Sequence, residues 1–257
     1  MASHTIVQLS DPHLTSKGTL SVGTRPRENL IKGLELLKEK GIRPDIYLMT
    51  GDLADEGEAG CYEDLASIMD KTGVPVVYLP GNHDNRQDFR RILLHQAPDD
   101  SPIDQVHWHN GLRIVSLDSV VPGADWGMIG KESVGFLAEA LASPASDGTI
   151  VALHHPPVDS LVEELTRTSL RNREALAEAI AGSDVRLVVC GHYHHEGGGT
   201  IGKVPVWVSP AVSFGTDTTS LVKFRPMLGS AISRIDIEGP RQTIEKIEVP
   251  ASGARPD

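Results

Sequence analysis

The sequence predicts a single α/β domain. Short apolar, β-rich runs recur along most of the chain, and amphipathic helical patterns separate them. This alternation is typical of α/β domains and not of helical bundles. Helical spacing fades after residue 218, where β-rich runs follow one another. The end of the chain is therefore expected to complete a sheet with antiparallel strands.

The expected strands fall into two groups. The first group has apolar centres and alternates with helices. It comprises residues 5–9, 45–49, 74–79, 112–117, 149–153, 185–190 and 204–208. The second group, near the end of the chain, comprises residues 220–224, 231–237 and 243–249.

The expected helices have one apolar face. In residues 28–40, Leu30, Leu34 and Leu37 share a face, and Gly41 provides a stop signal. Ser160 precedes Glu163 by three positions, which is a capping-box signature for a helix in this part of the chain. Further helices are expected at residues 131–142 and 171–180. The domain is expected to span residues 1–250, with a frayed tail at residues 251–257.

Composition restricts the function classes. The chain has 257 residues, 39% hydrophobic and 23% charged, which suits a globular protein with a sizeable core. Its formal charge of −11 argues against stable binding to duplex nucleic acid. The first residues lack a signal-peptide pattern, and no run is long enough to span a membrane. The two cysteines, Cys61 and Cys190, cannot form a disulfide framework, so a cytoplasmic protein is expected.

Polar residues follow five of the expected strands. In an open α/β sheet, residues just beyond the carboxyl ends of the strands converge on one crevice. Any one of these motifs alone has an ordinary reading as a turn or cap, but five in order favour a common site. The residues are Asp11 and His13 in "SDPH", Asp52 in "TGD", Asn82, His83 and Asp84 in "GNHD", His154 and His155 in "HHPP", and His192, His194 and His195 in "GHYHH".

These residue types indicate a metal centre. Carboxylate, amide oxygen and imidazole suit Fe, Mn, Zn or Co, and the absence of thiolates argues against a closed structural zinc site. Seven ligands are too many for one open catalytic ion. They suit two ions about 3.5–4 Å apart that share a carboxylate and a hydroxide.

The five motifs resemble those of the calcineurin-like metallophosphoesterases. More narrowly, the chain is similar to the bacterial class III cyclic nucleotide phosphodiesterases, close cousins of glycerophosphodiesterases, in the segments "QLSDPHL", "TGDLADEGE", "LPGNHDNR", "SVVPGADWGMIGKES", "LHHPP" and "GHYHHE". The resemblance covers roughly three quarters of the chain. It implies an α/β/β/α sandwich of two mixed β-sheets.

The resemblance also implies roles for individual residues. One ion would be held by Asp11, His13, Asp52 and His194, and the other by Asp52, Asn82, His154 and His192. His83 would bind no metal but would contact the phosphate and stabilise or protonate the leaving group. A metal-bridging hydroxide would attack phosphorus. The residues expected to contact substrate are His13, Asp52, Asn82, His83 and His194.

Several residues keep alternative interpretations. Asp55 is either a loop cap or a substrate contact, and Asp84 either orients His83 or holds a turn. His195 is expected outside the metal shell or at the surface, and His155 behind the ligands. Trp126 either stacks on a substrate ring or packs on the protein. His95, His107 and His109 are expected at the surface.

The function hypotheses differ in substrate. The first is a binuclear phosphodiesterase acting on 3′,5′-cyclic nucleotides such as cAMP, and the alternative is a glycerophosphodiesterase or a broad-specificity phosphodiesterase. A noncatalytic metal-binding scaffold is expected to lack some ligands or His83, and here none is missing. Purine-phosphate monoesters stay open as substrates, whereas exonuclease action is disfavoured because no basic track is evident. The resemblance favours a homodimer.

Overall fold

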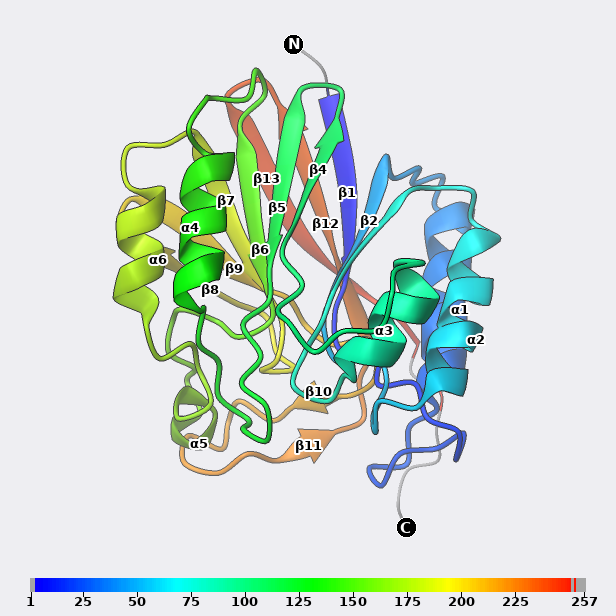
Figure 1. Cartoon of the computed structure of the whole chain (residues 1–257). Helices are drawn as coiled ribbons and strands as arrows, with labels where there is room; N and C mark the ends of the chain where they lie inside the picture. The colour runs from blue at the N-terminus through cyan, green and yellow to red at the C-terminus, as the bar shows by residue number, and fades with distance from the viewer. Residues whose placement is uncertain (1–2, 251, 253–257) are drawn as a thin grey trace.

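Two β-sheets pack face to face, and helices cover both outer faces (Figure 1). The computed structural model describes residues 3–250 and 252. The four layers confirm the α/β/β/α sandwich that the motifs imply. Hydrophobic residues fill three layers, one between the sheets and one beneath the helices on each side.

The five-stranded sheet holds the first strands of the chain. Its order is β13-β12-β1-β2-β3, with β1, β2 and β3 parallel and the C-terminal hairpin antiparallel to β1. The strands are β1 (Ser3–Leu9), β2 (Ile46–Thr50), β3 (Val76–Leu79), β12 (Ala231–Glu238) and β13 (Arg241–Glu248).

The six-stranded sheet is built from the middle of the chain. Its order is β4-β5-β6-β7-β9-β8, with parallel central strands and an antiparallel strand at each edge. The strands are β4 (Gln105–His109), β5 (Leu112–Leu117), β6 (Thr149–Leu153), β7 (Val185–Cys190), β8 (Gly197–Ile201) and β9 (Val204–Val208).

Helices divide between the outer faces. The first three lie on the five-stranded sheet, and α4 and α6 lie on the six-stranded sheet (Figure 1). The short helix α5 and the small β10–β11 ribbon lie together at one end of the sandwich (Figure 1). These elements are α1 (Pro26–Glu39), α2 (Ala59–Asp70), α3 (Arg86–Leu93), α4 (Lys131–Ala140), α5 (Glu163–Thr166), α6 (Arg173–Ile180), β10 (Gly215–Thr216) and β11 (Pro226–Met227).

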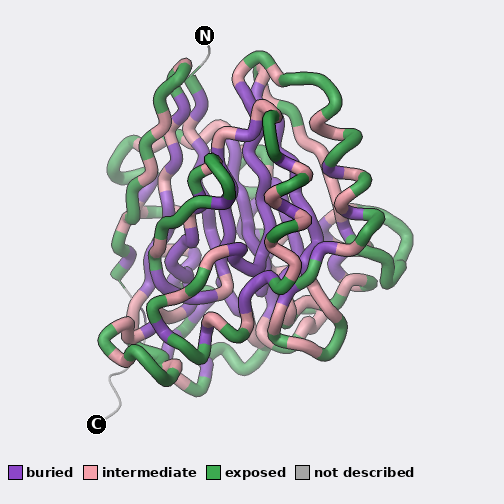
Figure 2. The backbone as a smooth tube through the Cα atoms, turned by 90° about the vertical axis from the view of Figure 1, so that its left-hand side faces the viewer, coloured by how far each residue is buried: buried purple, intermediate pink, exposed green. Residues whose placement is uncertain are grey.

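Alternation along the strands places side chains in different layers. Ile150 and Ala152 of β6 face the opposite sheet, whereas Val151 and Leu153 face the helices. Because both faces are covered, these strands are apolar throughout, as is typical of parallel sheets. Figure 2 shows the buried backbone concentrated in the sheets. The loops at the strand ends are therefore attached to two tightly packed sheets whose central strands are buried on both faces.

Two predictions of local structure are wrong, one of a strand and one of a helix cap. Residues 220–224 are not a strand, and the only ribbon nearby pairs Gly215–Thr216 with Pro226–Met227. The capping box also does not form, because α5 begins after Val162 and the Ser160 hydroxyl accepts from the Val162 amide instead. Strands β4 and β8, helix α3 and the bounds of α2 were not predicted from the sequence.

Three further observations concern the chain as a whole. Among the described residues, no helix is long and apolar enough to cross a membrane. Cys61 and Cys190 are both buried and free. Of the expected tail, Ser252 is buried and its carbonyl accepts from the Arg25 amide over 2.9 Å, whereas residues 251 and 253–257 lie outside the described part.

Candidate metal centre

The polar motifs meet where strands of both sheets end. β1, β2 and β3 of one sheet lead to the first three motifs, and β6 and β7 of the other lead to the last two. Backbone hydrogen bonds join neighbouring loops at these strand ends. The Asp11 amide donates to the Gly51 carbonyl over 3.1 Å, and the Gly191 amide donates to the His154 carbonyl over 3.0 Å. The predicted convergence of five strand ends is therefore present.

Backbone strain concentrates at the same loops. Among the described residues, seven that are not glycine have positive φ: Asp11, His13, Asp52, His95, Asn110, His192 and His194. All but His95 and Asn110 are predicted metal ligands. Positive φ is uncommon for residues with a side chain and persists where surrounding contacts enforce it, often at functional sites.

Four side chains form a first cluster. Asp11, His13, Asp52 and His194 are all buried, and each offers a ligand atom within 4.8 Å of the others. The Nε2 atoms of His13 and His194 are 3.2 Å apart, and His194 Nε2 lies 3.3 Å from Asp11 Oδ1. These are the four residues expected to hold the first ion.

Asp52 connects this cluster to a second one. Its Oδ2 lies 3.5 Å from His13 Nε2 and 3.3 Å from His154 Nε2. His154 Nε2 in turn lies 3.2 Å from Asn82 Oδ1. A nitrogen of His192 lies within 4.8 Å of one of His154. One carboxylate oxygen thus reaches imidazoles of both clusters, as a bridging ligand does.

The donor set fits two metal ions. Asp11 and Asp52 supply carboxylates, and Asn82 supplies its side-chain amide oxygen. The remaining donors are imidazoles, which bind metal in their neutral form. Transition-metal sites commonly combine these types, and in two-metal hydrolases the ions activate water and neutralise substrate oxygens. The residues present therefore match a binuclear centre in number and in kind.

Charge in the cluster shifts its protonation. Burial opposes ionisation of Asp11, yet His194 beside it lowers the pKa of this carboxyl to about 2. Burial likewise opposes protonation of His154, yet the Asp52 carboxylate raises the pKa of this ring to about 9. The carboxylates thus stay ionised and attract positive charge. Protons on the neighbouring imidazoles and metal ions compete for this site.

His83 lies at the exposed edge of the first cluster. Its ring packs edge-on against His13, with centroids 4.7 Å apart. Its Nδ1 lies 2.7 Å from the Asp55 carbonyl oxygen, so Nδ1 carries the hydrogen and Nε2 stays available. Burial acts against protonation, but Asp52 and Asp55 nearby raise the pKa of His83.

Asp55 and Asp84 support the loops. The Asp55 carboxylate accepts from His13 Nδ1 over 3.1 Å, so Asp55 orients a predicted ligand. This contact is neither of the two roles expected from the sequence, a loop cap or a substrate contact. Asp55 also lines the cavity at the centre, so a substrate contact stays a prediction. Asp84 accepts from the amides of Leu53, Ala54 and Gly81. Its role in holding the turn, the interpretation favoured from sequence, is confirmed.

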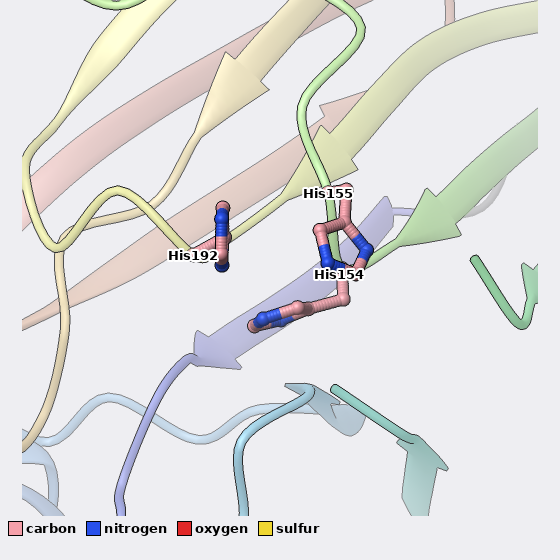
Figure 3. A group of neighbouring side chains, drawn as sticks. All are labelled: His154, His155 and His192. Carbon is pink, nitrogen blue, oxygen red and sulfur yellow. The ribbon is translucent and has the colours of Figure 1, made fainter. Parts of the chain in front are cut away.

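His155 and His195 are both buried. The His155 ring lies beside His154 and His192 (Figure 3). Its Nδ1 lies 2.8 Å from the Ser119 hydroxyl. His195 Nε2 lies 2.8 Å from the Ser160 hydroxyl, so His195 is not solvent-facing. Of the three histidines expected at the surface, His95 is exposed, whereas His107 and His109 are half-buried.

A cavity of about 800 Å³ opens onto the centre. Its wall comes from the loop at residues 15–22, from α5 and from residues 214–226, and includes Phe214 and Phe224. The loop between β5 and α4 contributes Asp125 to the same wall. Trp126 is half-buried beneath Arg171, whose guanidinium lies 3.7 Å from the ring centroid. Trp126 therefore packs on the protein.

Two hydroxyl side chains that contact histidines at the centre were not expected from the sequence. Thr168 contacts His192 over 2.7 Å, and Ser119 contacts His155. Neither lies in a motif, and a single hydroxyl residue in a loop gives no recognisable signal. The capping pattern around Ser160 predicted a helix just before Thr168 but gave no indication that Thr168 contacts a histidine.

Comparison with known proteins identifies the family. Residues 4–196 match the model of the calcineurin-like phosphoesterases, and this range contains all the predicted site residues. The chain belongs to the calcineurin-like phosphoesterase family. The match begins in β1 and ends just after the last motif, so the family's core is the part of the sandwich that carries the centre.

Relatives within this family include named phosphodiesterases. The chain is 38% identical over 221 residues to the cAMP/cGMP dual specificity phosphodiesterase of Mycobacterium tuberculosis, covering 84% of this chain and 70% of that protein. It is 29% identical to a probable glycerophosphodiester phosphodiesterase of Arcobacter nitrofigilis, covering 74% and 71%. A dimetal phosphatase from Danio rerio shares the fold, with a TM-score of 0.72, 14% identity and coverage of 97% and 99%.

Proposed function

We propose that this calcineurin-like phosphoesterase is a binuclear phosphodiesterase that hydrolyses 3′,5′-cyclic nucleotides. The observation that carries the proposal is the position of Asp52 Oδ2, within 3.5 Å of His13 and 3.3 Å of His154. This is the arrangement that two adjacent cations need. The relative named for cAMP and cGMP supports the substrate class.

The proposed ligand assignment is the one that the resemblance to the family implies. Asp11, His13, Asp52 and His194 would hold one ion, and Asp52, Asn82, His154 and His192 the other. When bound, two such ions lower the pKa of water and neutralise phosphate oxygens. The donor types accept Fe, Mn, Zn or Co.

His83 is proposed to act on the leaving group. Its Nδ1 is engaged by the Asp55 carbonyl, so its Nε2 is the nitrogen that can face a substrate in the cavity. A positioned imidazole donor at a departing alkoxide contributes typically 10²–10⁴-fold to rate. His13, Asp52, Asn82 and His194, which border the same space, are the other proposed substrate contacts.

The cavity suits a small ligand. Its volume of about 800 Å³ falls within the usual range for small-molecule sites. Phe214 and Phe224 offer apolar surface on which a nucleobase can pack. The net charge of −11 supports the proposal that stable duplex binding is absent. Two buried free thiols suit the reducing cytoplasm, where we propose the protein acts.

The acidic wall favours one alternative substrate. Asp125 and Glu164 line the same cavity, and a cationic group such as choline would be attracted to them. Glycerophosphocholine is therefore the second candidate, consistent with the glycerophosphodiesterase relative. Replacing both with Asp125→Asn and Glu164→Gln would lower kcat/KM for glycerophosphocholine more than for cAMP if this alternative holds.

A substrate panel on protein of known metal content tests the function. Purified protein, analysed for bound elements, is assayed on cAMP, glycerophosphocholine and bis-p-nitrophenyl phosphate before and after chelation. We expect cAMP to have the highest kcat/KM, activity to vanish with the ions and to return with Mn²⁺. Full activity in the stripped protein, or no cleavage of any diester by the two-ion form, would overturn the proposal.

A variant separates catalysis from metal binding. His83→Ala is expected to keep both ions and lose about 10²–10⁴-fold in kcat. The exposed His95, outside the cavity lining, provides the matched control as His95→Ala, for which no loss is expected. Turnover at the wild-type rate in His83→Ala would remove the role given to His83.

A further inference from the structure

Three of the four predicted imidazole ligands are held in the same way. Each has its Nδ1 beside an oxygen of the protein, which leaves Nε2 directed to the centre. A ligand histidine held through its second nitrogen has a defined tautomer and ring orientation. The contacts are His13 Nδ1 to Asp55 Oδ1 at 3.1 Å, His154 Nδ1 to the Thr50 carbonyl at 2.8 Å, and His194 Nδ1 to the Phe214 carbonyl at 3.1 Å.

His192 is held in the opposite sense. Its Nε2 lies 2.7 Å from the Thr168 hydroxyl oxygen. The same hydroxyl donates its hydrogen to the Leu165 carbonyl over 2.9 Å. Thr168 has only one hydrogen, so it must accept from His192, and His192 Nε2 must carry a hydrogen. The lone pair of the ring then belongs to Nδ1, for which the described residues provide no hydrogen-bond partner.

We propose that Thr168 is a positioning residue for metal binding. It selects the Nε2–H tautomer of His192 and directs Nδ1 toward the proposed second ion. This inference rests on the ligand assignment of the proposed function. Thr168 lies two residues after the end of α5 and lines the cavity together with Glu164 and Leu165. One hydroxyl thereby connects the substrate-facing wall with the metal centre.

A purely structural role predicts something different. If Thr168 only satisfied the Leu165 carbonyl at the end of α5, its loss would lower stability and leave metal binding unchanged. Thr166 offers a matched control, because its hydroxyl contacts only Ser160 in the described part of the chain and touches no imidazole. Metal affinity separates the two roles.

The first experiment measures Zn²⁺ binding by calorimetry to stripped protein. Thr168→Val removes the hydroxyl at constant shape, and Thr168→Ser keeps it. We expect Thr168→Val to bind one Zn²⁺ as the wild type does and the other about 10–100-fold more weakly. Thr168→Ser and Thr166→Val are expected to bind both ions normally. Unchanged binding of two ions by Thr168→Val would overturn the proposal.

The second experiment reads the tautomer in the unaltered protein. Nitrogen-15 NMR of histidine-labelled chain, metal-free and zinc-loaded, is expected to show His192 protonated at Nε2 in both states. A hydrogen on Nδ1 would overturn the proposal even if every variant failed to fold. Neither experiment uses a phosphodiester, so a wrong substrate class would leave these results unchanged. Failure to bind two ions in the wild type would instead contradict the proposed function.

Discussion

Asp52 Oδ2 and His154 Nε2 lie 3.3 Å apart although they follow strands of different sheets. Asp52 comes after β2 of the five-stranded sheet, and His154 after β6 of the six-stranded sheet. A cation bound by both side chains, as proposed, would link the two halves of the sandwich. Metal binding is therefore expected to affect the stability of the fold as well as catalysis.

Removing metal is expected to destabilise the protein. Each ion that binds only the folded chain stabilises it by about 2.7 kcal/mol when its free concentration is 100 times its Kd. The thermal midpoint should fall on chelation and recover with Mn²⁺, as measured by circular dichroism. Asp52→Asn should abolish most of this difference. Equal midpoints with and without chelator would contradict a cation linking the two sheets.

Gly191→Ala is expected to disrupt the first cluster. A Cβ at this position would overlap Ser10 Oγ and Asp11 Oδ2, so the loops would have to move apart. Overpacking of this kind costs about 1–3 kcal/mol. Urea unfolding and elemental analysis would show lower stability and a lost ion. The control Gly135→Ala lies in α4 with open space around it and should stabilise by about 0.5–1 kcal/mol.

Arg113→Met is expected to weaken the fold without altering the metal centre. This buried guanidinium at the start of β5 lies 2.8 Å from the Thr149 hydroxyl and 2.7 Å from Asp184 Oδ1. Breaking a buried pair costs about 3–5 kcal/mol, because Asp184 loses its only positively charged partner among the described residues. Denaturant unfolding would detect the loss, while metal content stays the same. An effect as small as that of Arg167→Met, at an exposed pair, would show that Asp184 finds another partner.

His107 is expected to contribute to acid sensitivity. Burial lowers the pKa of His107 below its ordinary value of 6.5. The folded state thus keeps the ring neutral at pH values where the unfolded chain already binds a proton. This contribution to stability is present above pH 6.5 and is lost as the pH falls toward the folded pKa. The free energy of unfolding of His107→Gln should fall less below pH 6.5 than that of wild type or exposed His95→Gln. A parallel pH dependence in all three would refute the assignment.

Strand prediction succeeded where burial on both faces leaves an apolar run. Residues 149–153 and 185–190 coincide with β6 and β7. The prediction failed at residues 220–224, whose β-rich composition lies in a loop at the cavity wall. Leu221 and Val222 are exposed there. Apolar content alone does not make a strand when no neighbouring strand offers hydrogen bonds.

The site was predictable as a set of motifs but not as a geometry. Five polar motifs, each behind a strand, sufficed to expect that Asp52, His154 and His194 converge. No spacing indicated that Asp55 would hold His13, or that Trp126 would lie under Arg171 rather than face a ligand. Such contacts join residues remote in sequence whose side chains carry no periodic signal.

The amino-acid sequence by itself determined the class of fold, the order of the strands that carry polar loops and the chemical types of the donors. These follow from local hydrophobic pattern and from residues adjacent to it. Only the tertiary structure decided which nitrogen of each histidine is free. That choice depends on partners such as Thr168 and the Thr50 carbonyl. It rests on hydrogen bonds between distant segments, which exist only after the two sheets have packed together.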